Sequence, residues 1–274
     1  MRTVVLFADS PQWREVALNA AKLIAAPEFR QLKAEGRTVA GFIDLAGLGT
    51  AFIKRVKVPS WRRGIAQRVR GSHAARALKG AEILKAAGFP HPEPFAAAEV
   101  YEAGALRESL LIGQALTNAD SLSRFALGPQ RHKARDVLRG RRISSAVAAQ
   151  VRRLHDSGLY TRDLQETNLM MEENGAGGFR VYFIDLEDFR RSDPVPWERR
   201  MLNLVHLDRS IGRFLNRPAR LHFLYAYLGG RPPRAEARKT AAAVLALRAR
   251  IDRRKRRGRA RNPRASRVAT AVIH

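Results

Sequence analysis

The chain has 274 residues, enough for one two-lobed domain and little else. Apolar residues make up 45% of the sequence, which allows a sizeable core, and the absence of cysteine excludes disulfides and thiolate metal sites. The 51 Lys and Arg residues against 25 Asp and Glu residues give a net charge of +26, an excess that favours a polyanionic neighbour such as nucleic acid, an anionic membrane face or a phosphorylated substrate.

Residues 1–29 predict a short strand and a helix with no chemical motif, and we treat them as an N-terminal extension. Residues 37–45 and 50–58 alternate between apolar and polar side chains, which predicts two strands joined by a turn. The alternation places Lys54 on the same face of the second strand as apolar neighbours. We therefore expect Lys54 to cover a ligand pocket; the alternative is a strand lysine that reaches solvent.

A helix is predicted after Ser72, because apolar residues recur there at helical spacing, and Glu82 lies on it. A short apolar strand follows at residues 109–112 and runs into Gly113-Gln114-Ala115. We expect this run to be the hinge between a small sheet lobe and a larger helical lobe.

A buried helix is predicted over residues 143–154, again from helical spacing of apolar side chains. His155 follows it and is a candidate general base. A histidine at a helix end is more often a packing or hydrogen-bonding residue, and we adopt that interpretation.

The strongest functional signal is the run Thr161-Arg162-Asp163-Leu164-Gln165-Glu166-Thr167-Asn168. Asp163 and Asn168 stand five positions apart, as in the H-R-D-L-x-x-x-N catalytic loop of protein kinases. In that loop the aspartate accepts the proton of the substrate hydroxyl and the asparagine holds magnesium.

A second aspartate completes the pattern. A turn at residues 174–178 and an apolar strand at 181–184 form a hairpin that returns Asp185 to the side of Asn168. Each would then offer one oxygen ligand to Mg²⁺, a hard cation. With Lys54 on its strand, the order and spacing of these residues indicate a phosphotransferase of the kinase fold.

Over residues 37–229 the sequence resembles the lipopolysaccharide core kinases, which are bacterial heptose and Kdo kinases related to the protein kinases. The resemblance is carried by Ala51-Phe52-Ile53-Lys54-Arg55, by residues 70–79, 88–94, 108–112 and 154–168, by Phe183-Ile184-Asp185-Leu186, and by residues 202–210.

This resemblance implies an α+β, protein-kinase-like fold with two lobes. The small sheet lobe with one helix would span residues 30–115 and the helical lobe residues 116–250. ATP would lie at the hinge run 113–115, and Glu82 would pair with Lys54 and hold it over the phosphates. Asp163 would be the catalytic residue.

Several positions depart from the protein-kinase pattern. Thr161 replaces the loop histidine, Gln165 stands where a lysine is usual, and Glu187 replaces the glycine of D-F-G. No G-x-G-x-x-G precedes Lys54, and the turn at residues 35–37 is the best remaining candidate for covering the phosphates. These differences argue against a regulated protein kinase and favour a small-substrate phosphotransferase.

The end of the chain, residues 251–274, reads as a basic tail. Its dense block at 253–261 is expected to extend a helix that Pro263 stops. We expect this block to dock on anionic lipid head groups beside a lipid-linked anionic sugar substrate. Binding of nucleic acid and an inert end are the alternatives.

No apolar run approaches the ~20 residues that span a bilayer, and the opening apolar run is too short for a signal-peptide core. We therefore expect a cytoplasmic protein at the inner face of the membrane. Two other functions stay open: a small-molecule or antibiotic phosphotransferase, and an inactive kinase-fold module that binds membrane or nucleic acid through its basic surface.

Overall fold

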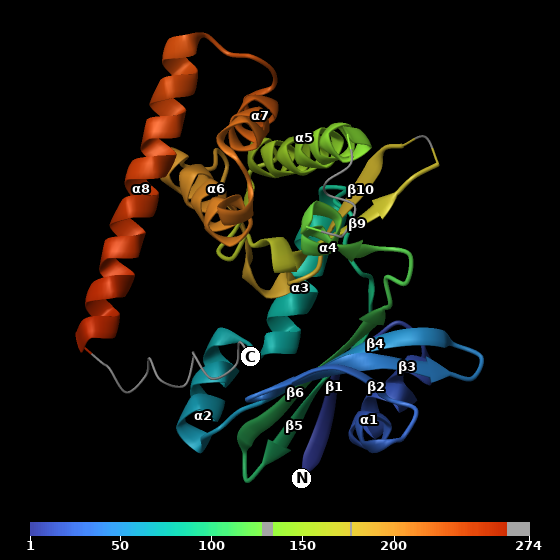
Figure 1. Ribbon diagram of the computed structural model, residues 1–274. Coiled ribbons are helices and arrows are strands. Elements are labelled where there is room, and N and C mark those ends of the chain that lie inside the picture. The colour runs from blue at the N-terminus through green and yellow to red at the C-terminus, as the bar shows by residue number, and fades with distance from the viewer. Residues whose placement is uncertain (128–133, 176, 262–274) are drawn as a thin grey trace. The chain divides into compact units, whose positions relative to one another are not determined.

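The computed structural model describes residues 1–127, 134–175 and 177–261 (Figure 1). The chain divides into two compact units, which are described separately. The first unit comprises Met1–Phe125 and Thr167–Arg191, and the second comprises Ala126–Glu166 and Ser192–His274. The predicted α+β class is confirmed, because the first unit is built on a sheet and the second on helices.

The first unit contains a six-stranded antiparallel sheet with the strand order β1-β5-β6-β4-β3-β2. Its strands are β1 (Arg2–Ala8), β2 (Arg30–Glu35), β3 (Thr38–Leu45), β4 (Gly49–Lys57), β5 (Pro94–Glu102) and β6 (Ala105–Gln114). Its helices are α1 (Pro11–Ala25), α2 (Trp61–Arg70) and α3 (His73–Ala86). A smaller sheet has the order β10-β9-β7, with β7 (Asp120–Ser121), β9 (Leu169–Glu173) and β10 (Phe179–Phe183). The single turn η2 (Leu186–Asp188) and β11 (Phe189–Arg191) follow.

Among its described residues, the second unit has helices and a single strand, β8 (Leu159–Thr161). Its helices are α5 (Ala134–Asp156), α6 (Trp197–Ser210), the single turn η3 (Gly212–Phe214), α7 (Arg217–Leu228) and α8 (Arg234–Arg261). Helix α4 (Leu122–Leu127) and the turn η1 (Glu166–Asn168) lie at the boundaries of the units.

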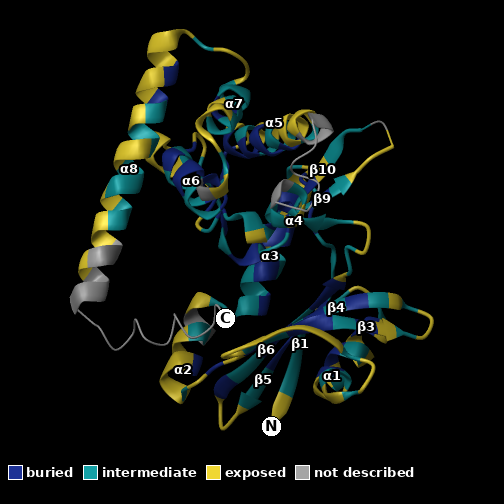
Figure 2. Ribbon diagram, in the orientation of Figure 1, coloured by how far each residue is buried: buried dark blue, intermediate teal, exposed yellow. Residues whose placement is uncertain are grey.

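The N-terminal residues are part of the first unit and not a separate extension, which corrects the predicted boundary at residue 29. Strand β1 pairs with β5, and α1 covers the sheet. Trp13 stacks on Phe95 with ring centroids 4.5 Å apart, and Ala17 and Ala20 are buried in the same core. Figure 2 colours the central strands β4, β5 and β6 mainly as buried or intermediate. The apolar face of α1 would otherwise be exposed, so burial on the sheet fixes its place.

The strands and the helix around Lys54 form as the sequence predicts. Strands β3 and β4 pair from Thr38↔Val56 to Leu45↔Gly49, which confirms the expected hairpin. Helix α3 begins after Ser72, whose side-chain oxygen accepts a hydrogen bond from the Ala75 N–H at 3.1 Å.

Helix α8 is held on α6 by ion pairs. The Asp208 carboxylate accepts from Arg220 at 2.7 Å and from Arg248 at 2.5 Å, and Arg209 pairs with Asp252 at 3.0 Å. Helix α8 runs without a break through residue 251, the first residue of the predicted basic tail, and on to Arg261. The predicted stop at Pro263 lies outside the described residues. Among the helices that the structure describes, none is long and apolar enough to cross a membrane.

Candidate active site

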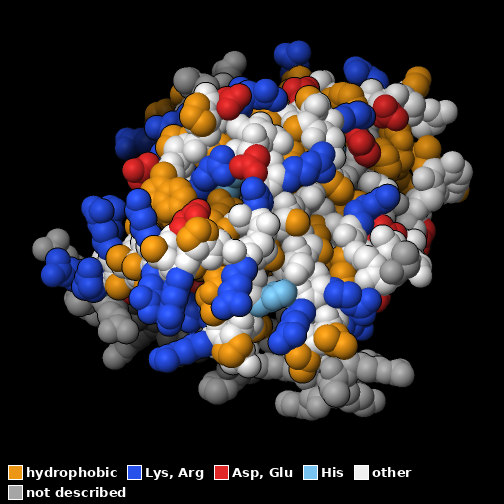
Figure 3. All heavy atoms as spheres, turned by 90° about the horizontal axis from the view of Figure 1, so that it is seen from above, with side chains coloured by type: hydrophobic (Ala, Val, Ile, Leu, Met, Phe, Trp, Pro, Cys, Tyr) orange, Lys and Arg blue, Asp and Glu red, His pale blue; other side chains and the backbone are white. Residues whose placement is uncertain are grey.

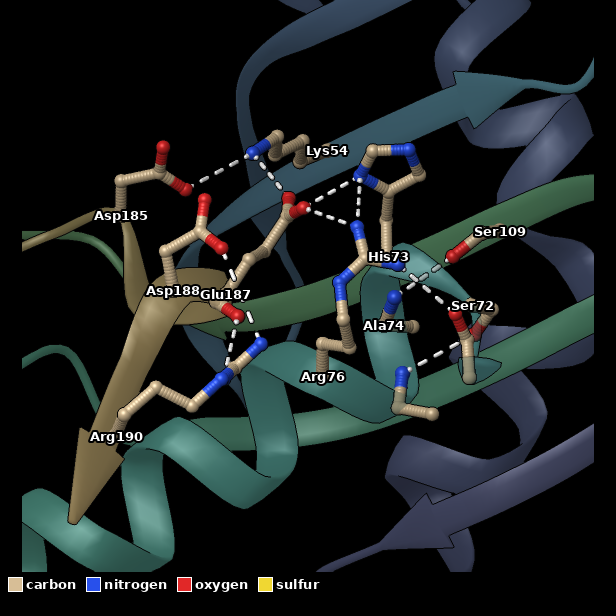
Figure 4. A network of polar contacts seen from close by, with 12 residues as sticks. Lys54, Ser72, His73, Ala74, Arg76, Ser109, Asp185, Glu187, Asp188 and Arg190 are labelled. Carbon is tan, nitrogen blue, oxygen red and sulfur yellow. Dashed lines mark hydrogen bonds and ion pairs between the residues drawn. The ribbon is translucent and has the colours of Figure 1, made fainter. Parts of the chain in front are cut away.

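Lys54 lies on β4, and its ammonium group is held by two carboxylates. Nζ is 2.9 Å from Glu187 Oε1 and 3.5 Å from Asp185 Oδ1 (Figure 4). Burial lowers the pKa of Lys54, but the charges of Glu187 and Asp185 outweigh this effect and raise the pKa above its ordinary value. Lys54 therefore stays a fixed positive charge.

The structure corrects the expected partner of Lys54. Glu82 is exposed on α3, because the face of this helix that packs on the unit carries Ala77, Gly80 and Leu84 instead. The glutamate that contacts Lys54 is Glu187, which the sequence had marked only as a departure from D-F-G.

Glu187 is the centre of a polar network. Its side chain is only 11% exposed, and its Oε2 lies 2.5 Å from His73 Nδ1 and 3.0 Å from an Arg76 guanidinium nitrogen. Burial alone would raise the pKa of Glu187, but the hydrogen bond from His73 and the charge of Lys54 lower it to about 2. His73 and Arg76 stand one turn apart on α3, and this pair of side chains able to bind a carboxylate at the start of a helix was the available sequence signal.

Asn168 and Asp185 are brought together by the predicted hairpin, which is confirmed. Strands β9 and β10 pair from Leu169↔Phe183 outward, and the Ile184 N–H donates to the Asn168 carbonyl at 3.1 Å. One carboxylate and one amide oxygen suit a hard cation such as Mg²⁺. Within the described ranges no group of three or more His, Asp and Glu residues could hold a metal. A cation here would take further ligands from water or phosphate.

Asp163 belongs to the second unit and lies two residues after the end of β8. Its carboxylate accepts a hydrogen bond from the Gln165 side chain, and its backbone N–H donates to the Thr161 hydroxyl at 3.3 Å. The next residue, Leu164, is 1% exposed and anchors the loop in the core. Gln165, found where protein kinases keep a lysine, therefore orients the aspartate.

Two polar residues of α6 form hydrogen bonds with the backbone of this loop. The Asn203 amide donates to the Thr161 carbonyl at 2.5 Å, and its oxygen accepts from the Thr161 N–H at 3.4 Å. At the other end of the helix, the Ser210 hydroxyl accepts from the Glu166 N–H at 3.3 Å. The helix therefore fixes the backbone on both sides of Asp163.

His155 is a structural residue, as predicted. It is 1% exposed, with Nε2 3.0 Å from Asn203 Oδ1 and Nδ1 2.9 Å from the Tyr227 hydroxyl. Burial lowers its pKa to about 4, so the ring is neutral at pH 7. Nε2 then carries the proton that Asn203 accepts, and Nδ1 accepts from Tyr227.

The predicted hinge run lies at the end of β6. Gly113 is buried where a side chain would meet the Glu93 carbonyl, and the Gln114 N–H donates to that carbonyl at 2.8 Å. The Ala115 carbonyl accepts from the Thr117 N–H at 3.0 Å. Two of the backbone groups in this run are thus bonded within the first unit.

The model of the lipopolysaccharide kinase (Kdo/WaaP) family matches residues 62–227. The chain belongs to this family. Membership makes it a kinase, and the kinase family implies the use of ATP. The family that the sequence resembles is thereby confirmed.

Two solved structures were compared with this chain. The structure described as "WaaP in complex with acyl carrier protein" matches with a TM-score of 0.64 at 22% identity, over 93% of this chain and 99% of that one. The crystal structure of the BubR1 kinase domain matches with a TM-score of 0.41 at 11% identity, over 62% of this chain and 48% of that one. No curated protein matches the chain. The WaaP likeness supports the predicted kinase-like fold.

The residues matched to the lipopolysaccharide kinase family include the catalytic-loop run, Asp185, Glu187 and the start of α3. Lys54 precedes the matched stretch. Its place in the site therefore rests on the contacts of its ammonium group.

Proposed function

We propose that the protein is an ATP- and Mg²⁺-dependent kinase that phosphorylates a sugar hydroxyl, heptose or Kdo, of the lipopolysaccharide core. The observation that carries this proposal is the Lys54 ammonium held between Asp185 and Glu187 in a chain of the lipopolysaccharide kinase family. A positive charge fixed beside a magnesium-type aspartate is the arrangement that phosphoryl transfer needs.

Each residue has a distinct role in this proposal. Lys54 contacts the α- and β-phosphates, and Asn168 and Asp185 hold Mg²⁺, which neutralises charge on the transferring phosphate. Asp163, oriented by Gln165, accepts the proton of the sugar hydroxyl. The hinge run 113–115 remains the predicted adenine contact.

The charge of the protein suits a lipid-linked anionic acceptor. Figure 3 shows a face on which Lys and Arg side chains outnumber Asp and Glu. On α8, Arg253, Arg254 and Arg257 are exposed. We propose that this part of α8 docks on anionic lipid at the cytoplasmic face of the membrane, where Lys and Arg side chains contribute roughly 1 kcal/mol each.

The function is tested with purified full-length protein, labelled ATP and lipopolysaccharide acceptors that lack core phosphates. Wild-type protein should transfer label to a core sugar only with Mg²⁺ present. Asp163→Ala should reduce kcat by roughly 100-fold or more, the usual contribution of a general base. Transfer of label by Asp163→Ala at the wild-type rate, or no transfer by wild-type protein to any core acceptor, would overturn the proposal.

A further inference from the structure

Helix α3 contributes positive rather than negative charge to the lysine site. In protein kinases the strand lysine pairs with a glutamate on the corresponding helix. Here the first turn of α3 has no acidic residue and instead presents His73 and Arg76 to Glu187 (Figure 4). The helix therefore brings a positive charge to the site, where the helix of a protein kinase brings a negative one.

The Arg76 guanidinium is a cation in the first turns of α3, which is unfavourable because it faces the positive end of the helix dipole. Glu187 supplies the missing negative charge at this end of α3. Its Oε2 accepts from both His73 and Arg76, while its Oε1 is left for Lys54. One carboxylate thus links the helix to the strand lysine through its two oxygens.

The helix start that carries His73 is itself fixed to the sheet. The Ala74 N–H donates to the Ser109 hydroxyl of β6 at 2.8 Å, and Arg76 donates to the Gly71 carbonyl at 2.8 Å. These bonds leave His73 and Arg76 little freedom to turn away from Glu187.

The backbone around Glu187 is also fixed against α3. A side chain at Gly80 would overlap the Leu186 carbonyl, so only glycine permits the observed approach of helix and turn η2. Asp185 and Glu187 therefore reach Lys54 from one short segment that α3 supports along its length.

We propose that Glu187 is the positioning residue for Lys54 and that α3 acts on this lysine through His73 and Arg76, not through a glutamate of its own. This inference rests on the proposed function, since it assigns Lys54 to ATP binding. It assigns one segment to two tasks: Asp185 to the cation and Glu187 to the lysine.

The test is a double-mutant cycle on Mg-ATP binding to the full-length chain, measured by calorimetry. Lys54→Met and Glu187→Gln should each weaken binding about fivefold or more, within the range of coupling between contacting residues. If Glu187 acts through Lys54, the double variant should bind no more weakly than Lys54→Met alone. A merely structural role of Glu187 would give additive losses and would overturn the inference.

Two further variants separate charge from folding. Glu187→Asp keeps a carboxylate for α3 but shortens its reach, so it should weaken Mg-ATP binding with a melting temperature near that of the wild type. Glu102→Gln is the matched control, because Glu102 forms a comparable 2.9 Å ion pair with Arg107 in the same unit. It should bind Mg-ATP as the wild type does.

Glu82→Gln decides between the two candidate glutamates. If it weakens binding while Glu187→Asp and Glu187→Gln do not, the inference is wrong and the proposed function stands. If the folded wild-type chain binds no Mg-ATP at all, the proposed function fails and the inference falls with it.

Discussion

Asn203 shows how a single buried amide can hold the backbone beside Asp163, the proposed catalytic residue. Its side chain bonds both backbone groups of Thr161, two positions before Asp163, and also meets the His155 ring. All three groups are buried, so each would lose its partner inside the core if the amide were removed.

Asn203→Ala should therefore cost about 1–3 kcal/mol of unfolding free energy, the usual penalty for buried unpaired groups. The freed loop should lower kcat about tenfold or more while the KM for ATP changes little, because the nucleotide residues lie elsewhere in the chain. Urea denaturation and steady-state kinetics check both effects. Asn19→Ala, which removes one local bond in α1, is the control. Equal effects of the two substitutions would contradict the role given to Asn203.

His155 predicts a pH dependence of stability. Its pKa is about 4 in the folded protein against 6.5 in the unfolded chain, so the unfolded state binds the extra proton between these values. Its contribution is fully present above pH 6.5 and is lost as pH falls toward 4, up to about 3 kcal/mol. Urea denaturation at pH 7 and pH 5 should show a smaller loss for His155→Gln than for the wild type. The same loss in both proteins would exclude His155 as the cause.

At the scale of elements, the approach of α3 to the turn η2 depends on Gly80. Gly80→Ala should move the helix away from Leu186 and destabilise the protein by about 1–3 kcal/mol, as overpacking does. Because His73, Arg76 and Glu187 would shift apart, the KM for ATP should also rise. Gly140→Ala is the matched control: this residue lies within α5 with open space around it, so alanine there should stabilise by about 0.5–1 kcal/mol. A Gly80→Ala variant as stable and active as wild type would contradict this packing.

Local elements were predictable from the sequence because their signals are local. Alternation predicted the β3–β4 pair and helical spacing predicted α3. The spacing of Asn168 from Asp185 with a turn between them predicted the hairpin. The partner of Lys54 was not predictable, because periodicity places Glu82 on a helix without showing which face of that helix packs against the rest of the unit. The strand at the N-terminus was predicted, but its place in the sheet was not, since its partner β5 lies some 90 residues later and no local pattern encodes that pairing.

At the scale of the whole molecule, the positive charge of α8 predicts that the protein binds to anionic membrane surfaces. Changing the exposed Arg253, Arg254 and Arg257 of α8 to Gln should weaken binding to anionic vesicles roughly 100-fold, at roughly 1 kcal/mol each. Binding by the wild type should fall at high salt. Co-sedimentation with anionic and neutral vesicles measures this.

The comparison needs a control on the same helix. Arg234, Arg238 and Lys239 are also exposed on α8 but belong to its first turns, so the same three changes to Gln there should weaken binding less. Equal binding by both triple variants would show that the helix end has no special role. Turnover of a soluble acceptor should be unchanged in both.

The position of Glu187 also affects how loss of activity is diagnosed in kinase-like proteins. A survey that looks for the helix glutamate would choose Glu82, find it pointing to solvent, and class the protein as a pseudoenzyme. A carboxylate that contacts Lys54 is present, but it belongs to Glu187, two residues after Asp185, and not to the helix. For such proteins, one should therefore first ask which side chain contacts the lysine in the structure, and only then which motif residue is missing from the sequence.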